Sequence, residues 1–324
     1  MARYVLKRVA LLLLTLWAAV TLNFLIPRLM PGSPTDAVIG KLQGRGLSPE
    51  AIRELEVALG VPEGSLVSQY WSYLGNVVHF RFGPSFNYFP IEVSTLIRDA
   101  LPWTLALIGI STILAFAIGT LLGVLAGWRR NGVFDGVATI GSTFVSAFPF
   151  FWTALLLAYV FAFTLEWLPL SGGSEDAPSW TWSFLWDAAR HSVLPATAVV
   201  IAALGTWLLA MRNNMINVLG EDYVVFAQAN GLRPRTIALR YAARNAILPS
   251  VTAFGIVFGF VVGGSLLVEL VFSYPGVGLL LFQAVTSSDY PLMQAIFLII
   301  TVSVLLANFA VDMLYLWLDP RVRR

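Results

Sequence analysis

Six long apolar runs constrain this chain more than any other feature of its sequence. Each run is long enough to cross the hydrocarbon core of a bilayer, which takes about 18 to 20 apolar residues in a helix. Within lipid, a spanning segment must satisfy its own backbone hydrogen bonds, and runs of this length do so as helices. The runs cover residues 9–26, 101–127, 133–167, 191–211, 251–271 and 291–318. The sequence therefore predicts an all-α, polytopic membrane protein with six transmembrane helices.

Composition supports this class. Hydrophobic residues make up 58% of the chain and charged residues only 12%, far from the usage of a soluble domain. There is no cysteine, so we expect neither a disulfide framework nor a thiolate metal site. Pro27 and Arg28, rather than a small-residue cleavage site, follow the first apolar run. That run is therefore expected to be an uncleaved transmembrane helix, with Asn23 making a hydrogen bond to another helix.

The basic residues predict the orientation. Most of the 20 lysines and arginines lie in short segments beside the predicted helix ends, where the positive-inside rule has most force. If these segments are cytoplasmic, both termini and residues 220–249 share the cytoplasmic side. We therefore expect a cytoplasmic N-terminus with the first helix at residues 1–30 and an extracytoplasmic segment at 31–99. A transmembrane core at 100–318 and a cytoplasmic tail at 319–324 complete the predicted organisation.

Residues 220–249 form the longest polar interruption in the second half of the chain. Asp222 lies where an acidic residue favours a helix N-terminus. Gly231 can end a first helix and Pro234 can begin a second one at its first turn. The pattern predicts a helix, a turn and a helix, carrying small residues at 227 and 229 and several arginines.

This segment resembles a known motif. Its A-x-A-x-G followed by L-P is similar to the EAA loop in permease subunits of binding-protein-dependent ABC importers. The longer form DYVxxAxAxGL…RxxxxRNAxLP resembles the dipeptide, oligopeptide and nickel branch. Four further segments match the B-type permease of peptide importers: RYVLKRV, MPGSP, YPGVG and VDMLYLWLDPRVR. The resemblance covers nearly the whole chain.

The resemblance implies a type I ABC importer transmembrane domain. In that family the loop is a coupling helix that docks in a groove on a cytoplasmic ATPase. The matching positions here are Asp222, Ala227, Ala229, Gly231, Arg233, Arg235, Arg240, Leu248 and Pro249. Implied partners are a second, C-type permease subunit, two cytoplasmic ABC ATPase subunits and an extracytoplasmic substrate-binding protein. ATP and magnesium would bind to the ATPases, and we expect no cofactor in this chain.

Sequence motifs that would support other functions are missing. Neither Lys7 nor Lys41 lies in a phosphate-binding G-x-x-x-x-G-K-[ST] motif, and no H-E-x-x-H or G-x-S-x-G occurs. His79 and His191 are too far apart in sequence to suggest a metal site. We therefore expect no enzymatic activity in this chain, and the resemblance implies a permease in the inner membrane of a prokaryote, without nucleic-acid partners. The alternative to an ATP-driven permease is a secondary transporter driven by an ion gradient. Such carriers usually hold ionisable residues at mid-membrane.

The cargo is less constrained. The resembling branch suggests di- or oligopeptides, with oligosaccharides or nickel chelates as alternatives. Pro149 is expected to kink the third apolar run, and nearby aromatic residues could face the pathway or the lipid: Phe144, Phe148 and Phe151. A loop in residues 82–102 carries Phe86 and Tyr88, which either contact cargo or binding protein, or only pack as a cap. Residues 68–80 predict an aromatic amphipathic helix suited to the membrane interface.

Overall fold

The computed structural model describes residues 2–29, 54 and 64–318. Within this part of the chain the fold is helical, and the only β pairing is an isolated bridge between Pro84 and Glu92. The chain divides into two compact units, one of Met1–Trp103 with Gly276–Arg324 and one of Thr104–Pro275. Residues 31–53 and 55–63 of the predicted extracytoplasmic segment lie outside the described residues, and so does the MPGSP motif at 30–34.

Five described helices, and one bent pair of helices, are long and apolar enough to span a membrane. Six spans result if the bent pair counts as one, in agreement with the six predicted runs. The elements, in chain order, are α1 (Ala2–Leu29), α4 (Leu66–Val78), α5 (Val93–Trp128), α6 (Val133–Ser146), α7 (Phe150–Leu157), η1 (Ala158–Thr164), α8 (Trp182–Leu219), α9 (Asp222–Ala229), α10 (Pro234–Thr236), η2 (Ile237–Ala243), α11 (Arg244–Gly259), η3 (Val261–Gly263), α12 (Leu266–Val271), α13 (Val277–Ser287) and α14 (Tyr290–Leu318).

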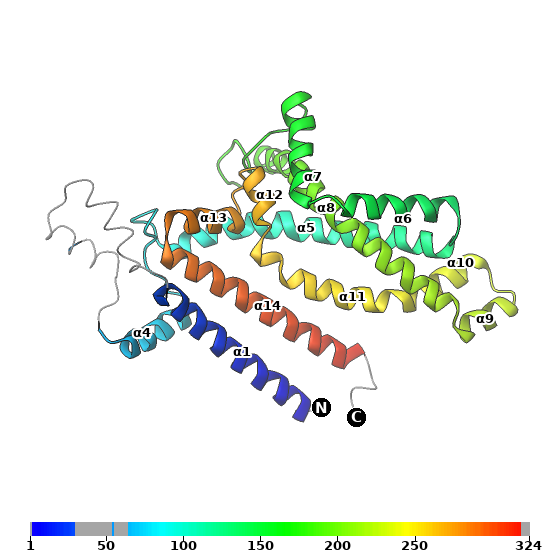
Figure 1. The fold of residues 1–324 in the computed structure, drawn as a ribbon, viewed down its shortest axis with the longest axis horizontal. Helices are drawn as coiled ribbons and strands as arrows, with labels where there is room; N and C mark the ends of the chain where they lie inside the picture. Colours follow the sequence, from blue (N-terminus) through cyan, green and yellow to red (C-terminus); the bar gives the residue numbers. More distant parts are fainter. Residues whose placement is uncertain (1, 30–53, 55–63, 319–324) are drawn as a thin grey trace. The chain divides into compact units, whose positions relative to one another are not determined.

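In the first unit, α1 and α14 run side by side (Figure 1). Asn23 donates from Nδ2 to the Gln294 carbonyl at 2.8 Å, and Gln294 Nε2 donates back to the Asn23 carbonyl at 3.0 Å. The predicted interhelical role of Asn23 is therefore confirmed. Near the other end of α1, Arg8 Nη1 lies 2.9 Å from Asp312 Oδ2 on α14. Polar contacts at both ends thus hold two largely apolar helices in register.

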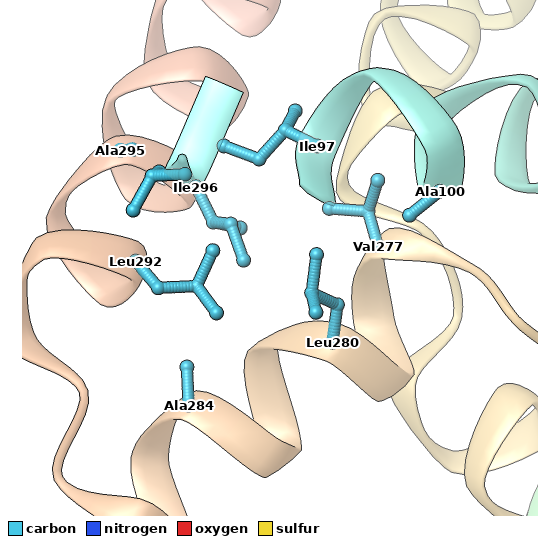
Figure 2. Packing of buried hydrophobic residues seen from close by; sticks show 9 residues of the cluster. Ile97, Ala100, Val277, Leu280, Ala284, Leu292, Ala295 and Ile296 are labelled. Carbon is cyan, nitrogen blue, oxygen red and sulfur yellow. The ribbon is translucent and has the colours of Figure 1, made fainter. Parts of the chain in front are cut away.

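The core of the first unit lies where α5, α13 and α14 meet. Figure 2 shows that their aliphatic side chains point toward one another, with Leu280 of α13 facing Ile97 of α5 and Leu292 of α14. All nine members are buried: Val93, Ile97, Ala100, Val277, Leu280, Ala284, Leu292, Ala295 and Ile296. This packing fixes the short helix α13, which is too short to span a membrane, against two spanning helices.

In the second unit, α5 and α8 approach at the distance of backbone contact. A Cβ added to Gly123 would lie 2.6 Å from the Leu208 carbonyl oxygen, and one added to Gly127 would lie 2.5 Å from Met215 Cβ. Gly119, one turn earlier, meets Trp207 in the same way. Small residues four apart allow such close packing between membrane helices. The two helices are thus packed so closely that no side chain larger than that of glycine fits at these positions.

The third apolar run is a broken span rather than a kinked one. The structure ends α6 at Ser146 and begins α7 at Phe150, with Pro149 in the N-cap position. The two helices are bent by 93°. Proline lacks a backbone N–H and restricts the residue before it, so it starts a helix more readily than it continues one. The predicted bend at Pro149 is confirmed, and it is larger than a kink.

The fifth apolar run also differs from its prediction. The expected span at 251–271 instead begins at Pro234 and ends near Gly263. Gly264 then adopts a φ of +68°, and α12 forms a separate short helix. A Cβ at Gly264 would lie 2.6 Å from Oε1 of the buried Glu269. The turn therefore needs glycine for both its backbone conformation and its space.

Candidate functional site

The 220–249 segment connects two spanning helices. α8 ends at Leu219, α9 follows as an eight-residue helix, and α10 begins a helix that continues through η2 into α11. Glu221 takes the N-cap position and Asp222 the first turn of α9. Pro234 occupies the first turn of α10. The predicted helix–turn–helix is therefore present, with the start of each helix where the sequence placed it.

The end of α9 is a complete Schellman motif. The N–H of Gly231 donates to the Gln228 carbonyl at 2.9 Å, and the N–H of Leu232 donates to the Ala227 carbonyl at 3.3 Å. Gly231 has a φ of +72°, in the left-handed region that side chains with a Cβ rarely adopt. No atom lies within 4 Å of where its Cβ would be. Backbone conformation rather than space therefore calls for glycine here.

The inner face of α9 packs against its own chain. Val224, Ala227 and Ile237 form a buried cluster, and Ala227 is only 4% exposed. Trp128 at the end of α5 and Tyr241 of η2 pack against this cluster. The small side chain of Ala227 therefore fits a site inside the chain, whereas Ala229 is exposed.

The outer face of α9 is apolar and exposed. Phe226 is 71% exposed, and Tyr223, Val225 and Leu232 also face outward. Tyr223 is held in place by Asn245, whose Nδ2 lies 2.9 Å from the tyrosine Oη and 3.0 Å from the Tyr241 carbonyl. We call the exposed side chains of Tyr223, Val225, Phe226, Ala229 and Leu232 the α9 patch. A polar segment that turns such a patch outward offers a protein-binding surface.

Exposed basic side chains follow the α9 patch along the chain. Arg233 and Arg235 are exposed at the start of the second helix, and Arg240 is exposed one to two turns later. Leu248 and Pro249 are also exposed, but they lie within α11 rather than at the end of the segment. The helix passes through Pro249 without a break. Asp222 and Ala229 thus lie on α9 itself, the arginines lie at the start of the second helix, and Leu248 and Pro249 lie along the following span.

A charged pair that sequence reasoning missed lies just before this segment. Arg212 lies within α8 and donates to Asp135 of α6 from two of its nitrogens. Asn131 N–H also donates to Asp135 at 2.9 Å, and Thr139 Oγ1 donates to it at 3.3 Å. Asp135 is buried. A lone aspartate at the start of an apolar run was the signal available in the sequence.

The aromatic pathway candidates divide at the break in the third span. Phe144 and Phe148 pack edge to face with ring centroids 5.1 Å apart, and both are exposed in this chain. Phe151 lies beyond the break, on α7, and is half-buried. The three residues therefore do not lie on one side of a single helix, because the helix does not continue through 147–149.

The candidates at Phe86 and Tyr88 lie in a loop that is fixed to the first unit. Ser85 Oγ and the Asn87 N–H both donate to Asp289, which is fully buried and also accepts from the Leu292 N–H at the start of α14. Tyr88 Oη donates to Gln283 Oε1 at 2.8 Å. The Tyr88 hydroxyl is thus engaged within the chain, and Phe86 is half-buried.

Two further groups of the second unit have structural roles. Thr104 Oγ1 donates to Glu269 Oε1 at 3.1 Å, and Glu269 lies within the short helix α12 rather than in a spanning helix. Tyr274, the first residue of the YPGVG motif, is buried with its hydroxyl 3.0 Å from Ser192 Oγ of α8. Burial raises the pKa of Tyr274 above its usual value. Among the described residues, no group of three or more His, Cys, Asp or Glu side chains is placed to hold a metal ion.

Comparison with known proteins places these features in a family. A family model described as binding-protein-dependent transport system inner membrane component matches residues 119–324. A putative peptide permease protein of Brucella suis is 34% identical over 323 residues, covering 100% of this chain and 99% of that protein. The di/tripeptide transport system permease protein DppB of Pseudomonas aeruginosa is 34% identical over 343 residues, with the same coverage. The oligopeptide transport system permease protein AppB of Bacillus subtilis is 33% identical over 322 residues, covering 99% of each chain.

Proposed function

Because the chain belongs to the family of binding-protein-dependent transport system inner membrane components, and is thus a multi-pass membrane permease subunit, we propose that it imports di- or oligopeptides. We further propose that ATP hydrolysis in a partner subunit drives this import through the 220–249 segment. Support for the cargo comes from relatives at 33–34% identity over the full chain, whose names specify peptides. The energy coupling rests on the geometry of α9.

The observation that carries the coupling proposal is the two-sided packing of α9. Its inner face is buried against the ends of α5, α8 and η2, while the α9 patch is free to contact another protein. A force applied to the patch would therefore pass into α8 on one side and into the η2–α11 helix on the other. Arginines that follow the patch along the chain can pair with acidic groups on an ATPase, although each exposed ion pair contributes only about 0–1 kcal/mol. Apolar burial would supply most of the affinity.

The proposed assembly contains this chain, a second permease subunit of the C type, two ATPase subunits and an extracytoplasmic binding protein. The two permease subunits would form the pathway and alternate between outward and inward access. ATP and magnesium would be bound by the ATPases, with no cofactor in this chain. Phe144, Phe148 and Phe151 are proposed to contribute to the pathway or its gate, where the broken span gives two helix segments that can move separately.

The proposed orientation places both termini and the 220–249 segment in the cytoplasm. The distribution of basic residues supports this orientation. Since the chain lacks cysteine, single cysteines can report it directly. A membrane-impermeant maleimide added to intact cells should label cysteine at Ser65 and Ser174 but not at Gly220. Labelling at Gly220 from outside would overturn the orientation.

Cross-linking tests the docking of α9. Cysteine at Ala229, in the α9 patch, should form a cross-link with a single cysteine in the ATPase groove, and ATP should change its yield. Cysteine at Ser174 provides the control, because it is far along the chain and is expected on the opposite side of the membrane. The absence of a cross-link from position 229 in an active complex would refute the proposed coupling role of the patch.

The cargo is tested separately with the partner binding protein. Calorimetry with di- and oligopeptides should give saturable binding, whereas oligosaccharides and nickel chelates should give none. Binding of an oligosaccharide in place of peptides would contradict the proposed cargo and leave the coupling proposal intact.

A further inference from the structure

α4 is an apolar helix outside the candidate spans. It covers Leu66–Val78 and contains no charged side chain over its 13 residues. Ser65 caps its start by accepting from the Ser68 N–H at 3.3 Å. At 13 residues it is too short to cross a bilayer. Its position and its apolar surface are not explained by the proposed transport mechanism.

Polar and aromatic contacts hold α4 against one end of α1. Tyr70 Oη lies 2.7 Å from Thr21 Oγ1, and Asn23 Nδ2 donates to Tyr73 Oη at 3.1 Å. The Tyr70 ring also meets Phe24 edge to face at 5.2 Å. All three α1 residues lie in the last two turns of its apolar span, Val5–Ile26. The contacts therefore place α4 at the level where this span leaves the hydrocarbon core.

Arg28 marks the polar side of that boundary. Its guanidinium donates to Gln69 Oε1 of α4 at 3.3 Å and to the Phe24 carbonyl at 2.8 Å. The same group lies 3.7 Å above the Phe24 ring. An arginine at the end of an apolar span is typical of the membrane interface, where its charge reaches the headgroups.

The surface of α4 has three sectors. One sector packs toward α1 and contains the half-buried residues Gln69, Tyr70, Tyr73, Leu74 and Val77. A second sector, opposite, is polar or small and contains Ser68, Ser72, Gly75 and Asn76. Between them runs a stripe at the helical spacing i, i+4 and i+11 of exposed Val67, Trp71 and Val78. Phe80, just beyond the helix, is also exposed.

We propose that α4 lies in the interfacial layer of the bilayer, with Val67, Trp71 and Val78 inserted among the lipids. The occupant of the stripe is lipid because α4 is bonded to α1 where the apolar span of α1 ends, and only 11% of the apolar window of that span is buried inside the chain. Trp71 is 67% exposed, and tryptophan concentrates at the level where headgroups meet acyl chains. The inference requires only that α1 spans the membrane, on whichever side α4 lies.

Because α4 carries no charged side chain, its attachment to the bilayer does not include electrostatic attraction to anionic lipid. Most interfacial helices add electrostatic attraction to anionic lipid through Lys and Arg on the polar face. α4 has a polar face of serine, glycine and asparagine, so its insertion depends on apolar burial and on its tether to α1. Its depth is therefore expected to be the same in zwitterionic and anionic bilayers and at low and high salt.

Spin labels on single cysteines test the inference in the assembled transporter. The matched pair is Trp71→Cys, in the stripe, and Ser72→Cys, its exposed neighbour in the polar sector; Val67→Cys and Ser68→Cys repeat the comparison. The complete complex is reconstituted into phosphatidylcholine vesicles, with and without phosphatidylglycerol. Accessibility to oxygen, which concentrates in lipid, is compared with accessibility to a water-soluble nickel chelate.

Insertion predicts a several-fold higher oxygen-to-nickel ratio at 71 and 67 than at 72 and 68, unchanged by phosphatidylglycerol. High nickel accessibility at all four positions would overturn the inference and leave the stripe in water. Labels at 67 and 71 that are immobile and inaccessible to both reagents would also overturn it, since a protein partner would then cover the stripe. Each result is independent of cargo and of ATP.

Discussion

Replacing Gly231 tests how strictly the turn after α9 positions the docking surface. Gly231 has a φ of +72°, and its N–H and that of Leu232 close the last turn of α9. No neighbouring atom lies within 4 Å of an added Cβ. Substitution therefore changes the backbone preference of one residue and introduces no clash, which makes its effect calculable.

A side chain with a Cβ in the left-handed conformation costs roughly 1–2 kcal/mol. That cost corresponds to a factor of about 5–30 in the population of the native turn. If only the native turn presents the α9 patch correctly, Gly231→Ala should raise the apparent Kd for the ATPase by up to about thirtyfold. Gly231→Asn should have a much smaller effect, because asparagine tolerates this region. Gly231→Val should raise the apparent Kd more than Gly231→Ala does, because β-branching makes a positive φ still less favourable.

The assay is ATPase binding to the purified permease pair in nanodiscs, together with binding-protein-stimulated ATP hydrolysis. The control is Gly136→Ala in α6, where the glycine is helical and nothing lies within 4 Å of the added Cβ. That variant should bind the ATPase normally. Equal affinities for the Gly231→Ala and Gly231→Asn variants and the unsubstituted protein would refute the argument that the turn positions the patch.

Three further predictions follow from the same geometry. Ala227→Leu should lower the thermal midpoint in detergent because overpacking a filled site costs about 1–3 kcal/mol, whereas Ala229→Leu should leave the midpoint unchanged and weaken ATPase binding; equal midpoints would contradict the packing of α9. Asp135→Leu should destabilise the chain by a part of the roughly 3–5 kcal/mol that breaking a fully buried pair costs, since Arg212 keeps some exposure. Combining it with Arg212→Met should recover stability, and an additive loss would argue against the pair. Alanine at Phe144, Phe148 and Phe151 should change the KM or the rate of uptake. Unchanged kinetics would indicate that these side chains face lipid rather than the pathway.

The number and approximate positions of the spans could be predicted from the sequence because apolar length reports membrane crossing directly. Helix ends were less predictable. α8 begins at Trp182 and ends at Leu219, well outside the predicted 191–211, because polar residues such as Asp187 and Arg212 continue the helix. Their partners lie in other segments, since Ser174 donates to Asp187 and Arg212 donates to Asp135, and no local pattern reveals these bonds.

The breaks show a similar limit. Pro149 signalled a bend, but the 93° change of direction depends on how α7 packs against α8. At Gly264, a glycine pair preceded a serine in the sequence, yet the lack of space for a side chain there comes from the buried carboxylate of Glu269, five residues later. The turn at Gly231 was predictable because a Schellman motif is formed by residues close together in the sequence, and glycine at its C′ position marks it.

Peptide uptake by proteoliposomes tests the central claim most directly. The vesicles contain this chain, its second permease subunit and the ATPases, with the binding protein and a labelled tripeptide supplied on the extracytoplasmic side. The account predicts that accumulation requires ATP hydrolysis, persists when a protonophore abolishes the proton gradient, and is lost in the double variant Gly231→Val with Ala229→Glu. Accumulation without ATP that collapses on addition of the protonophore would contradict it.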